Sequence, residues 1–218
     1  MYFSVNVDLS RILVRYGGIV RDTRTSMKRN SYTTKRLEIR AYTLKDYKAW
    51  FEAYTESLPK SSKHDVEPYL ASECSKQVFK TFVVKHRELA KIDRTYIWGI
   101  YDKKSGVQVG TIDIHILVRD ELQKANLGYR IFNRYWRKGF AKEAVKKICK
   151  EALIDLKLNR LEAVIDSDNM PSIKLAKSLG FRSEGVRENY FFQDDRWDDQ
   201  AVFVVDRKLL KLPALKPW

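Results

Sequence analysis

The stretch LGYRI at residues 127–131, followed by WRKGFA at residues 136–141, decides the fold of this chain. We interpret the first segment as a strand and the second as a short basic loop that contains Gly139. A strongly periodic helix follows directly. This order predicts a strand, a phosphate-binding loop and the start of a helix.

The helix that begins near Ala141 carries the apolar stripe of an amphipathic helix. The first backbone N–H groups of such a helix have no intrahelical partner and lie at the positive end of its dipole, so they bind phosphate well. Gly139 lets the backbone approach an anion, and Arg137 and Lys138 add positive charge. The alternative interpretation is a tight turn with two solvated basic residues. The stripe consists of Ala141, Ala144, Val145, Ile148, Cys149, Ala152, Leu153 and Leu156.

Strands and helices alternate through the rest of the chain. Apolar alternation indicates the strands, and capping residues and three-to-four-residue spacing indicate the helices. The expected strands cover residues 36–40, 96–101, 107–118, 127–131, 161–166 and 201–205, and the expected helices cover residues 43–54, 72–90, 141–156 and 173–179.

This series of motifs resembles the GCN5-related N-acetyltransferase (GNAT) superfamily, and within it the branch that acetylates the N-terminal alanine or serine of ribosomal proteins. The resemblance covers roughly residues 33–208 and rests on LGYRI, WRKGFAKEA, NMPS, SLGFRSEGVRENY and DRWDDQAVF taken together. Trp136 departs from the superfamily's loop pattern, whereas Gly139 and Ala141 fit it. The resemblance implies an α/β (α+β) fold, with a mixed, mostly antiparallel, twisted sheet of about seven strands, splayed central strands and flanking helices.

The resemblance also implies acetyl coenzyme A as the acetyl donor. In the superfamily the pantetheine arm lies between the strands matched by residues 127–131 and 161–166, and the pyrophosphate lies on the loop. A strand whose neighbour has moved away has free N–H and C=O groups for such a peptide-like arm. Helix capping is the alternative role for Asn169 and Ser172. The expected cofactor-binding residues are Leu127, Tyr129, Ile131, Arg137, Lys138, Gly139, Phe140, Ala141, Asn169 and Ser172.

Acetyl transfer to an amine requires a base for the amine's proton and a donor that steadies the leaving thiolate. Asp113 and His115 alternate with three isoleucines, so they share one face of a strand. We predict that this face looks into the acceptor site and that one of the two residues is the base. The alternative is a polar face satisfied by its neighbours. As the acid we predict Ser172 or Tyr190, and plain packing is the alternative role for Tyr190.

The composition fits one enzyme-sized domain. With 218 residues, 44% of them hydrophobic, the chain can bury a large core without a structural metal or disulfide. Its two cysteines, Cys74 and Cys149, form no CxxC pair, which favours a reduced, cytoplasmic protein. The three histidines are scattered, so we expect no metal site. No apolar run approaches the ~20 residues that span a bilayer, so we expect no membrane association.

The net charge of +14, from 42 Lys and Arg against 28 Asp and Glu, attracts polyanions. We predict that residues 1–32 form a basic extension that contacts the ribosome or its RNA, and a generally lysine-rich proteome is the alternative. Residues 21–33 are polar and expected to be mobile. We assign residues 33–208 to the catalytic domain and residues 209–218 to a tail, in a monomer or homodimer.

Three functions from different classes follow. The leading hypothesis is transfer of acetyl to the N-terminal α-amino group of a ribosomal protein by direct attack. The second is acetylation of a small amine such as a polyamine, an aminoglycoside or an amino acid, because a fold does not fix a substrate. The third is a non-catalytic protein that binds coenzyme A or RNA.

Overall fold

The computed structural model describes residues 31–193 and 195–216. Within them a single eight-stranded sheet has the order β1-β2-β3-β4-β5-β6-β8-β7, and only β5 and β6 pair in parallel. This confirms the predicted mixed, mostly antiparallel sheet. The strands are β1 (Ser31–Thr33), β2 (Leu37–Ala41), β3 (Thr95–Asp102), β4 (Gln108–Val118), β5 (Lys124–Ile131), β6 (Arg160–Asp166), β7 (Arg182–Gln193) and β8 (Arg196–Asp206).

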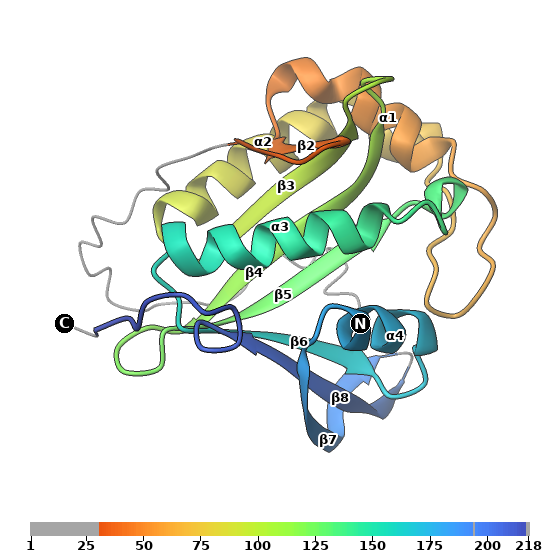
Figure 1. The fold of residues 1–218 in the computed structure, drawn as a ribbon. Coiled ribbons are helices and arrows are strands. Elements are labelled where there is room, and N and C mark those ends of the chain that lie inside the picture. The colour runs from red at the N-terminus through yellow and green to blue at the C-terminus, as the bar shows by residue number, and fades with distance from the viewer. Residues whose placement is uncertain (1–30, 194, 217–218) are drawn as a thin grey trace.

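Helices cover both faces of the sheet (Figure 1). α3 and α4 pack on one face, and α1 and α2 pack on the other. Three short 3₁₀ helices lie in the connections. The helices are α1 (Tyr47–Thr55), α2 (Lys76–Lys91), α3 (Phe140–Asp155) and α4 (Met170–Ser178), and the 3₁₀ helices are η1 (Leu44–Asp46), η2 (Ala71–Cys74) and η3 (Asn133–Tyr135).

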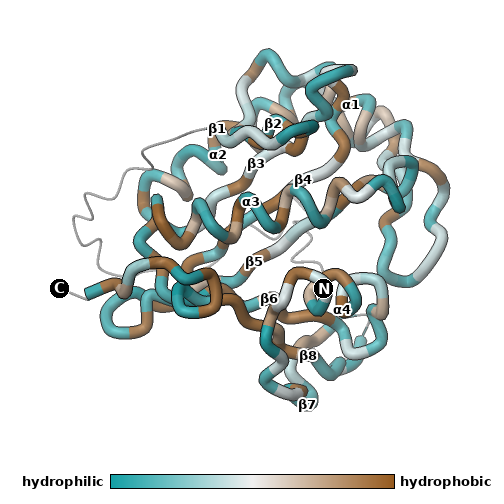
Figure 2. Tube along the Cα trace, viewed as in Figure 1, coloured by the Kyte–Doolittle hydropathy of each residue, from teal (hydrophilic) through white to brown (hydrophobic). Residues whose placement is uncertain are grey.

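The main core lies between α3 and the sheet. Ala144 and Ile148 of α3 are fully buried, as are Ile112 and Ile114 of β4. Figure 2 shows hydrophobic and hydrophilic residues alternating along α3, which agrees with the predicted amphipathic stripe. Since Ile112 and Ile114 face α3, the β4 residues that alternate with them point to the other face of the sheet, which α1 and α2 cover. A second, aromatic cluster under α1 and α2 contains Trp50, Phe79, Phe82 and Ile97.

The sheet begins earlier than the sequence predicted. Residues 21–33 were expected to be mobile, but Ser31–Thr33 forms β1, and this adds one strand to the expected seven. Tyr32 is 3% exposed, packs edge-on against Trp98 at 6.0 Å and donates from its hydroxyl to Asp155 at 3.1 Å. One buried aromatic residue is thus enough to anchor an otherwise polar segment. Residues 1–30 of the predicted basic extension lie outside the described residues.

Among the described residues, every helix is too short or too polar to cross a membrane. Cys74 and Cys149 are both buried free thiols, as expected for a chain that does not depend on disulfides.

Candidate functional site

β5 and β6 diverge soon after they begin. Beyond their last shared pair, Asn126 with Glu162, β5 runs on along β4 and β6 runs on along β8, so a fork opens between them (Figure 1). Beyond Asn126, β6 no longer pairs with β5 within the described residues, so an extended ligand can lie along the side of β5 that β6 leaves. This confirms the predicted splayed strands. The three pairs before the fork are Lys124 with Arg160, Ala125 with Leu161 and Asn126 with Glu162.

The loop between β5 and α3 has the backbone of an anion-binding site. Arg137 and Gly139 both adopt the left-handed conformation, with φ of 58° and 78°. α3 starts directly afterwards at Phe140, so the N–H groups of its first turn have no helical partner. Left-handed residues beside a helix start turn backbone N–H groups toward a common point, where an anion binds. The predicted loop residues from Arg137 to Ala141 thus surround one helix N-terminus.

Arg36 holds this loop from a distant part of the sequence. Its Nη1 donates to the carbonyl oxygen of Lys138 at 2.8 Å, its Nε donates to Glu143 at 2.7 Å, and its guanidinium lies 4.7 Å from the ring of Phe140. Burial raises the pKa of Glu143, but hydrogen bonds from Thr34 and Arg36 outweigh burial and hold that pKa below its usual value. The sequence analysis missed this role, since 102 residues separate Arg36 from Lys138.

Asp113 and His115 lie on the sheet face opposite α3, as their alternation predicted. Asp113 is 6% exposed, and its Oδ2 lies 2.9 Å from Nε2 of His115. Nδ1 of His115 lies 3.1 Å from the hydroxyl of Thr95. In the register of β4 and β5, Asp113 stands opposite Gly128 and His115 stands opposite Asn126. The carboxylate and the imidazole therefore lie beside the start of the fork, where they can pass a proton between them.

An aromatic pocket between α1 and α2 opens on the same side of the sheet. The guanidinium of Arg130 lies 5.8 Å from the ring of Tyr54 and 5.0 Å from the ring of Phe132. Burial raises the pKa of Tyr54 to about 12 against the opposing charge of Arg130, so Tyr54 is neutral. The aromatic rings of Trp50, Tyr54, Tyr69 and Phe82 make the wall of this pocket largely apolar. The pocket is lined by Trp50, Tyr54, Tyr69, Glu73, Cys74, Val78 and Phe82.

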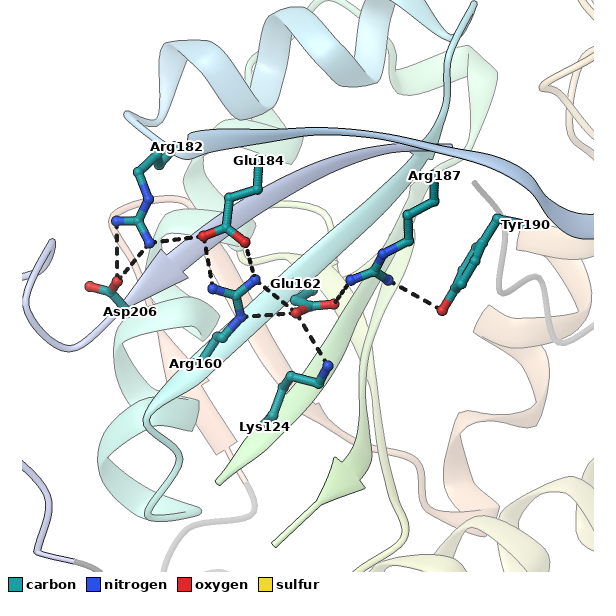
Figure 3. A network of polar contacts seen from close by, with 8 residues as sticks. All are labelled: Lys124, Arg160, Glu162, Arg182, Glu184, Arg187, Tyr190 and Asp206. Carbon is teal, nitrogen blue, oxygen red and sulfur yellow. Dashed lines mark hydrogen bonds and ion pairs between the residues drawn. The ribbon is translucent and has the colours of Figure 1, made fainter. Parts of the chain in front are cut away.

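Glu162 is buried at the narrow end of the fork among basic side chains (Figure 3). Its carboxylate lies 2.8 Å from Arg160, 3.0 Å from Arg187 and 3.4 Å from Lys124. Burial raises the pKa of Glu162, but hydrogen bonds from Arg160 and Arg187 and the neighbouring charges lower it overall. Glu162 is therefore ionised and paired, which makes it a poor base. Sequence reasoning missed this network, whose members come from three strands.

The two predicted acids lie on different elements. Ser172 is in the first turn of α4, and its backbone N–H donates to Oδ1 of Asn169 at 3.2 Å. Asn169 thus caps α4, which is the alternative role given for it. Tyr190 lies on the edge strand β7, is 43% exposed and accepts a hydrogen bond from Arg187 at 3.2 Å. Figure 3 shows Arg187 between Tyr190 and Glu162, so Tyr190 is tied to the fork through one guanidinium.

A segment at residues 58–70, which we call the strap, is attached to both arms of the fork. On the β5 side, Nδ2 of Asn133 donates to the carboxylate of Asp65 at 2.9 Å. On the β6 side, the ring of His64 lies 3.2 Å from the carboxylate of Asp166 and 3.1 Å from that of Asp168. The strap therefore crosses from the end of β5 to the end of β6 on the acceptor side.

The described residues hold no cluster of three or more His, Cys, Asp or Glu side chains placed to bind a metal ion. The features above fit a ligand that combines phosphate groups with an extended amide chain. The loop at Arg137–Ala141 is suited to phosphate, and the side of β5 from which β6 diverges is suited to the extended chain.

Comparison with known proteins agrees with this geometry. Residues 36–182 match the family model of the acetyltransferase (GNAT) domain. The uncharacterized N-acetyltransferase YoaA of Bacillus subtilis (strain 168) is 30% identical over 172 residues, which cover 79% of this chain and 94% of YoaA. The ribosomal protein uS5-alanine N-acetyltransferase of Escherichia coli (strain K12) is 24% identical over 185 residues, which cover 82% of this chain and 92% of the relative.

A solved structure shares the fold. RimJ of Mycobacterium smegmatis in complex with CoA-disulfide aligns with a TM-score of 0.66 at 20% identity, over 82% of this chain and 85% of RimJ.

Proposed function

Since this chain belongs to the GNAT family of acetyltransferases, as its motifs predicted, we propose that it transfers acetyl from acetyl coenzyme A to the N-terminal α-amino group of a protein. The fork between β5 and β6 is the observation that carries this proposal, because the side of β5 from which β6 diverges leads to the loop at the start of α3. A relative that acetylates the alanine of ribosomal protein uS5 supports a protein acceptor.

The cofactor is held mainly by backbone. Leu127 and Tyr129 would hold the pantetheine arm along the side of β5 from which β6 diverges, and Arg137–Ala141 would hold the pyrophosphate. Ile131 contributes less than the sequence analysis expected, because its carbonyl oxygen already accepts a hydrogen bond from Nε1 of Trp136 at 2.7 Å. Asn169 and Ser172 shape the start of α4 beside the fork. When bound, acetyl coenzyme A supplies an activated acetyl group and a thiolate leaving group.

Asp113 takes the proton of the attacking amine, and His115 relays it. This assignment follows from burial, because Asp113 is 6% exposed while the side chain of His115 is 22% exposed and closer to solvent. A positioned base of this kind contributes about 10²–10⁴-fold to the rate. Ser172 or Tyr190 steadies the leaving thiolate. The hydroxyl of Tyr190 is the acceptor in its contact with Arg187, so its own O–H group is left to donate to the thiolate.

The proposed acceptor is a ribosomal protein in the cytoplasm, and the basic residues 1–32 are proposed to bring the enzyme to RNA. Neutralising several phosphates makes such binding steeply dependent on salt concentration.

Two matched glycine variants test the proposal. Gly139 and Gly106 both have left-handed φ angles, of 78° and 73°, so valine costs similar backbone strain at each. Gly139 lies in the anion-binding loop, and Gly106 lies in the turn between β3 and β4. We expect calorimetric titration to show that acetyl coenzyme A binds wild type and Gly106→Val but binds Gly139→Val at least about tenfold more weakly.

A thiol-release assay on peptides that begin with alanine or serine completes the test. Turnover of these peptides by wild type supports a protein acceptor. Turnover confined to polyamines, aminoglycosides or amino acids would overturn that acceptor while keeping the acetyltransferase. Wild type that does not bind acetyl coenzyme A would overturn the whole proposal.

A further inference from the structure

The side-chain oxygen of Asn126 is a buried hydrogen-bond acceptor at the start of the fork. Asn126 is 3% exposed, and its Oδ1 accepts no hydrogen bond from any residue that the structure describes. Leaving a buried polar group unpaired costs about 1–3 kcal/mol, so native proteins rarely do so without a reason. An atom of this kind at the edge of a reaction site indicates a donor that arrives with a ligand.

The register of the strands places Asn126 on the acceptor face. Ala125 and Leu127 pack into the core under α3, so Asn126 projects to the opposite side of β5. It stands opposite His115 of β4 and opposite Glu162 of β6, at the last pair before the strands part. Asn126 is therefore the last β5 residue on this face that is paired with β6.

A second buried acceptor lies on the same face. Oδ2 of Asp113 is also buried; Nε2 of His115 lies 2.9 Å from it, but not in the alignment of a hydrogen bond. Asp113 of β4 stands opposite Gly128 of β5, and Gly128 follows Asn126 by two residues along β5. Both buried oxygens would be satisfied by a ligand group that donates several N–H hydrogen bonds and requires no hydrogen-bond donor in return. A primary amine or ammonium has that chemistry, whereas a hydroxyl or a thiol offers one donor.

We propose that Asn126 binds the amino group of the acceptor, with its Oδ1 accepting one N–H while Asp113 receives the proton that is lost. This inference rests on the proposed acetyltransferase activity and assigns an acceptor-binding residue to it. Because the amide of Asn126 is uncharged, it orients the amine without raising its proton affinity as a second carboxylate would. The amine's lone pair is then directed toward the fork, where the acetyl donor binds.

Substitution by leucine separates this role from a structural one. Asn126→Leu keeps the approximate volume and removes the unpaired oxygen, so its melting temperature should equal or exceed that of wild type. A hydrogen bond to a reacting amine is nevertheless lost, so we expect KM for the amine to rise at least about tenfold. The dissociation constant of acetyl coenzyme A, measured by calorimetry, should be unchanged. Asn126→Asp keeps an acceptor oxygen and should recover part of the lost amine affinity.

Gln108→Leu is the matched control. Gln108 of β4 is fully buried and also has an unpaired amide oxygen, but its Nε2 donates to Tyr42 at 2.6 Å, and it lies at the far end of β4 from His115. The Gln108→Leu variant should be less stable than wild type and should keep the wild-type KM for the amine.

The assay uses the amine that wild type acetylates fastest, whatever its class, so a wrong acceptor class leaves the role of Asn126 measurable. An Asn126→Leu enzyme with wild-type KM for the amine overturns the inference. So does a variant that loses acetyl coenzyme A instead, because Asn126 would then serve the pantetheine arm. A wild type that acetylates no amine overturns the activity itself.

Discussion

The carboxylate of Asp113 occupies the space that a side chain at position 128 would fill. A Cβ added to Gly128 would lie 2.4 Å from Oδ2 of Asp113 and 2.8 Å from its Oδ1. Glycine is therefore required on β5 for the carboxylate on β4 to reach across the strand toward the fork. The glycine of LGYRI thus makes room for the carboxylate that we propose as the base.

Gly128→Ala should push the Asp113 carboxylate away from the fork. We expect a destabilisation of about 1–3 kcal/mol from overpacking, together with a fall in kcat. Asp113→Ala relieves the crowding, so the double variant should be more stable than the sum of the two single changes predicts. Urea unfolding of the four proteins measures this coupling. Strictly additive free energies of unfolding would show that Asp113 and Gly128 do not compete for space.

The sequence predicted those features that depend on neighbours along the chain. The stripe of α3, the helix start just after Gly139 and the shared face of Asp113 and His115 all follow from local spacing, and the structure agrees with each. Contacts between distant segments carry no such signal. Nothing near Arg36 in the sequence points to Lys138, although the two are hydrogen-bonded.

The burial of Asn126 and Glu162 also escaped prediction, for a physical reason. Polar residues on strands usually face solvent, and only the pairing of β5 with β6 places these two opposite each other in the interior. Tyr32 shows the reverse error, because a polar neighbourhood concealed one aromatic residue that belongs to the core.

Arg36→Ala should weaken cofactor binding although Arg36 lies outside the loop. Loss of its bonds to Lys138 and Glu143 frees the backbone that receives phosphate, so we expect the dissociation constant of acetyl coenzyme A to rise about tenfold. Arg182→Ala removes the same charge from a site paired with Glu184 and Asp206, and it controls for long-range attraction. Equal weakening in both variants would mean that only net charge matters.

Both cysteines should resist thiol reagents in the folded protein. Burial raises the pKa of Cys74 to about 11 and raises that of Cys149 as well, so neither forms a thiolate near neutral pH. We expect a chromogenic disulfide to label native enzyme slowly and to label two thiols in guanidinium chloride, which is the full cysteine content. Rapid labelling of one native thiol would reveal local opening around that residue.

The network around Glu162 should make the fold acid-sensitive. The folded-state pKa of Glu162 lies below its usual value of 4.5, and a hydrogen bond from Arg160 lowers that of Glu184 to about 2. A carboxyl group whose pKa is lower in the folded than in the unfolded protein stabilises the fold at any pH above its unfolded-state pKa. This stability is lost as the pH falls through its folded-state pKa. Urea midpoints should therefore decline steeply below about pH 4.5.

Glu162→Gln tests whether Glu162 or another carboxylate causes the loss of stability in acid. It leaves Arg160, Arg187 and Lys124 without their buried anion, so we expect a loss of about 3–5 kcal/mol at neutral pH and a shallower decline in acid. Glu188→Gln removes an exposed carboxylate from β7 and should leave the profile unchanged. A wild-type slope in Glu162→Gln would assign the acid sensitivity to other groups.

Asn133→Ala should detach the strap from β5. The Asn133 side chain joins the end of β5 to the strap through Asp65 and through both backbone groups of Leu58, at 2.7–2.9 Å. Removing these bonds leaves His64 and the ion pair of Lys63 with Asp168 as ties to the β6 side, so the strap should open more often. Lys60 and Lys63 lie in the strap, and trypsin should cleave there faster in the variant than in wild type. Cleavage at Lys103 and Lys104, in the turn between β3 and β4, should be unchanged and calibrates protease activity.

Because the strap borders the acceptor side, KM for the amine should rise while acetyl coenzyme A binds as before. Unchanged cleavage at Lys60 and Lys63 would show that the contacts of His64 and Lys63 with Asp166 and Asp168 are sufficient to hold the strap closed.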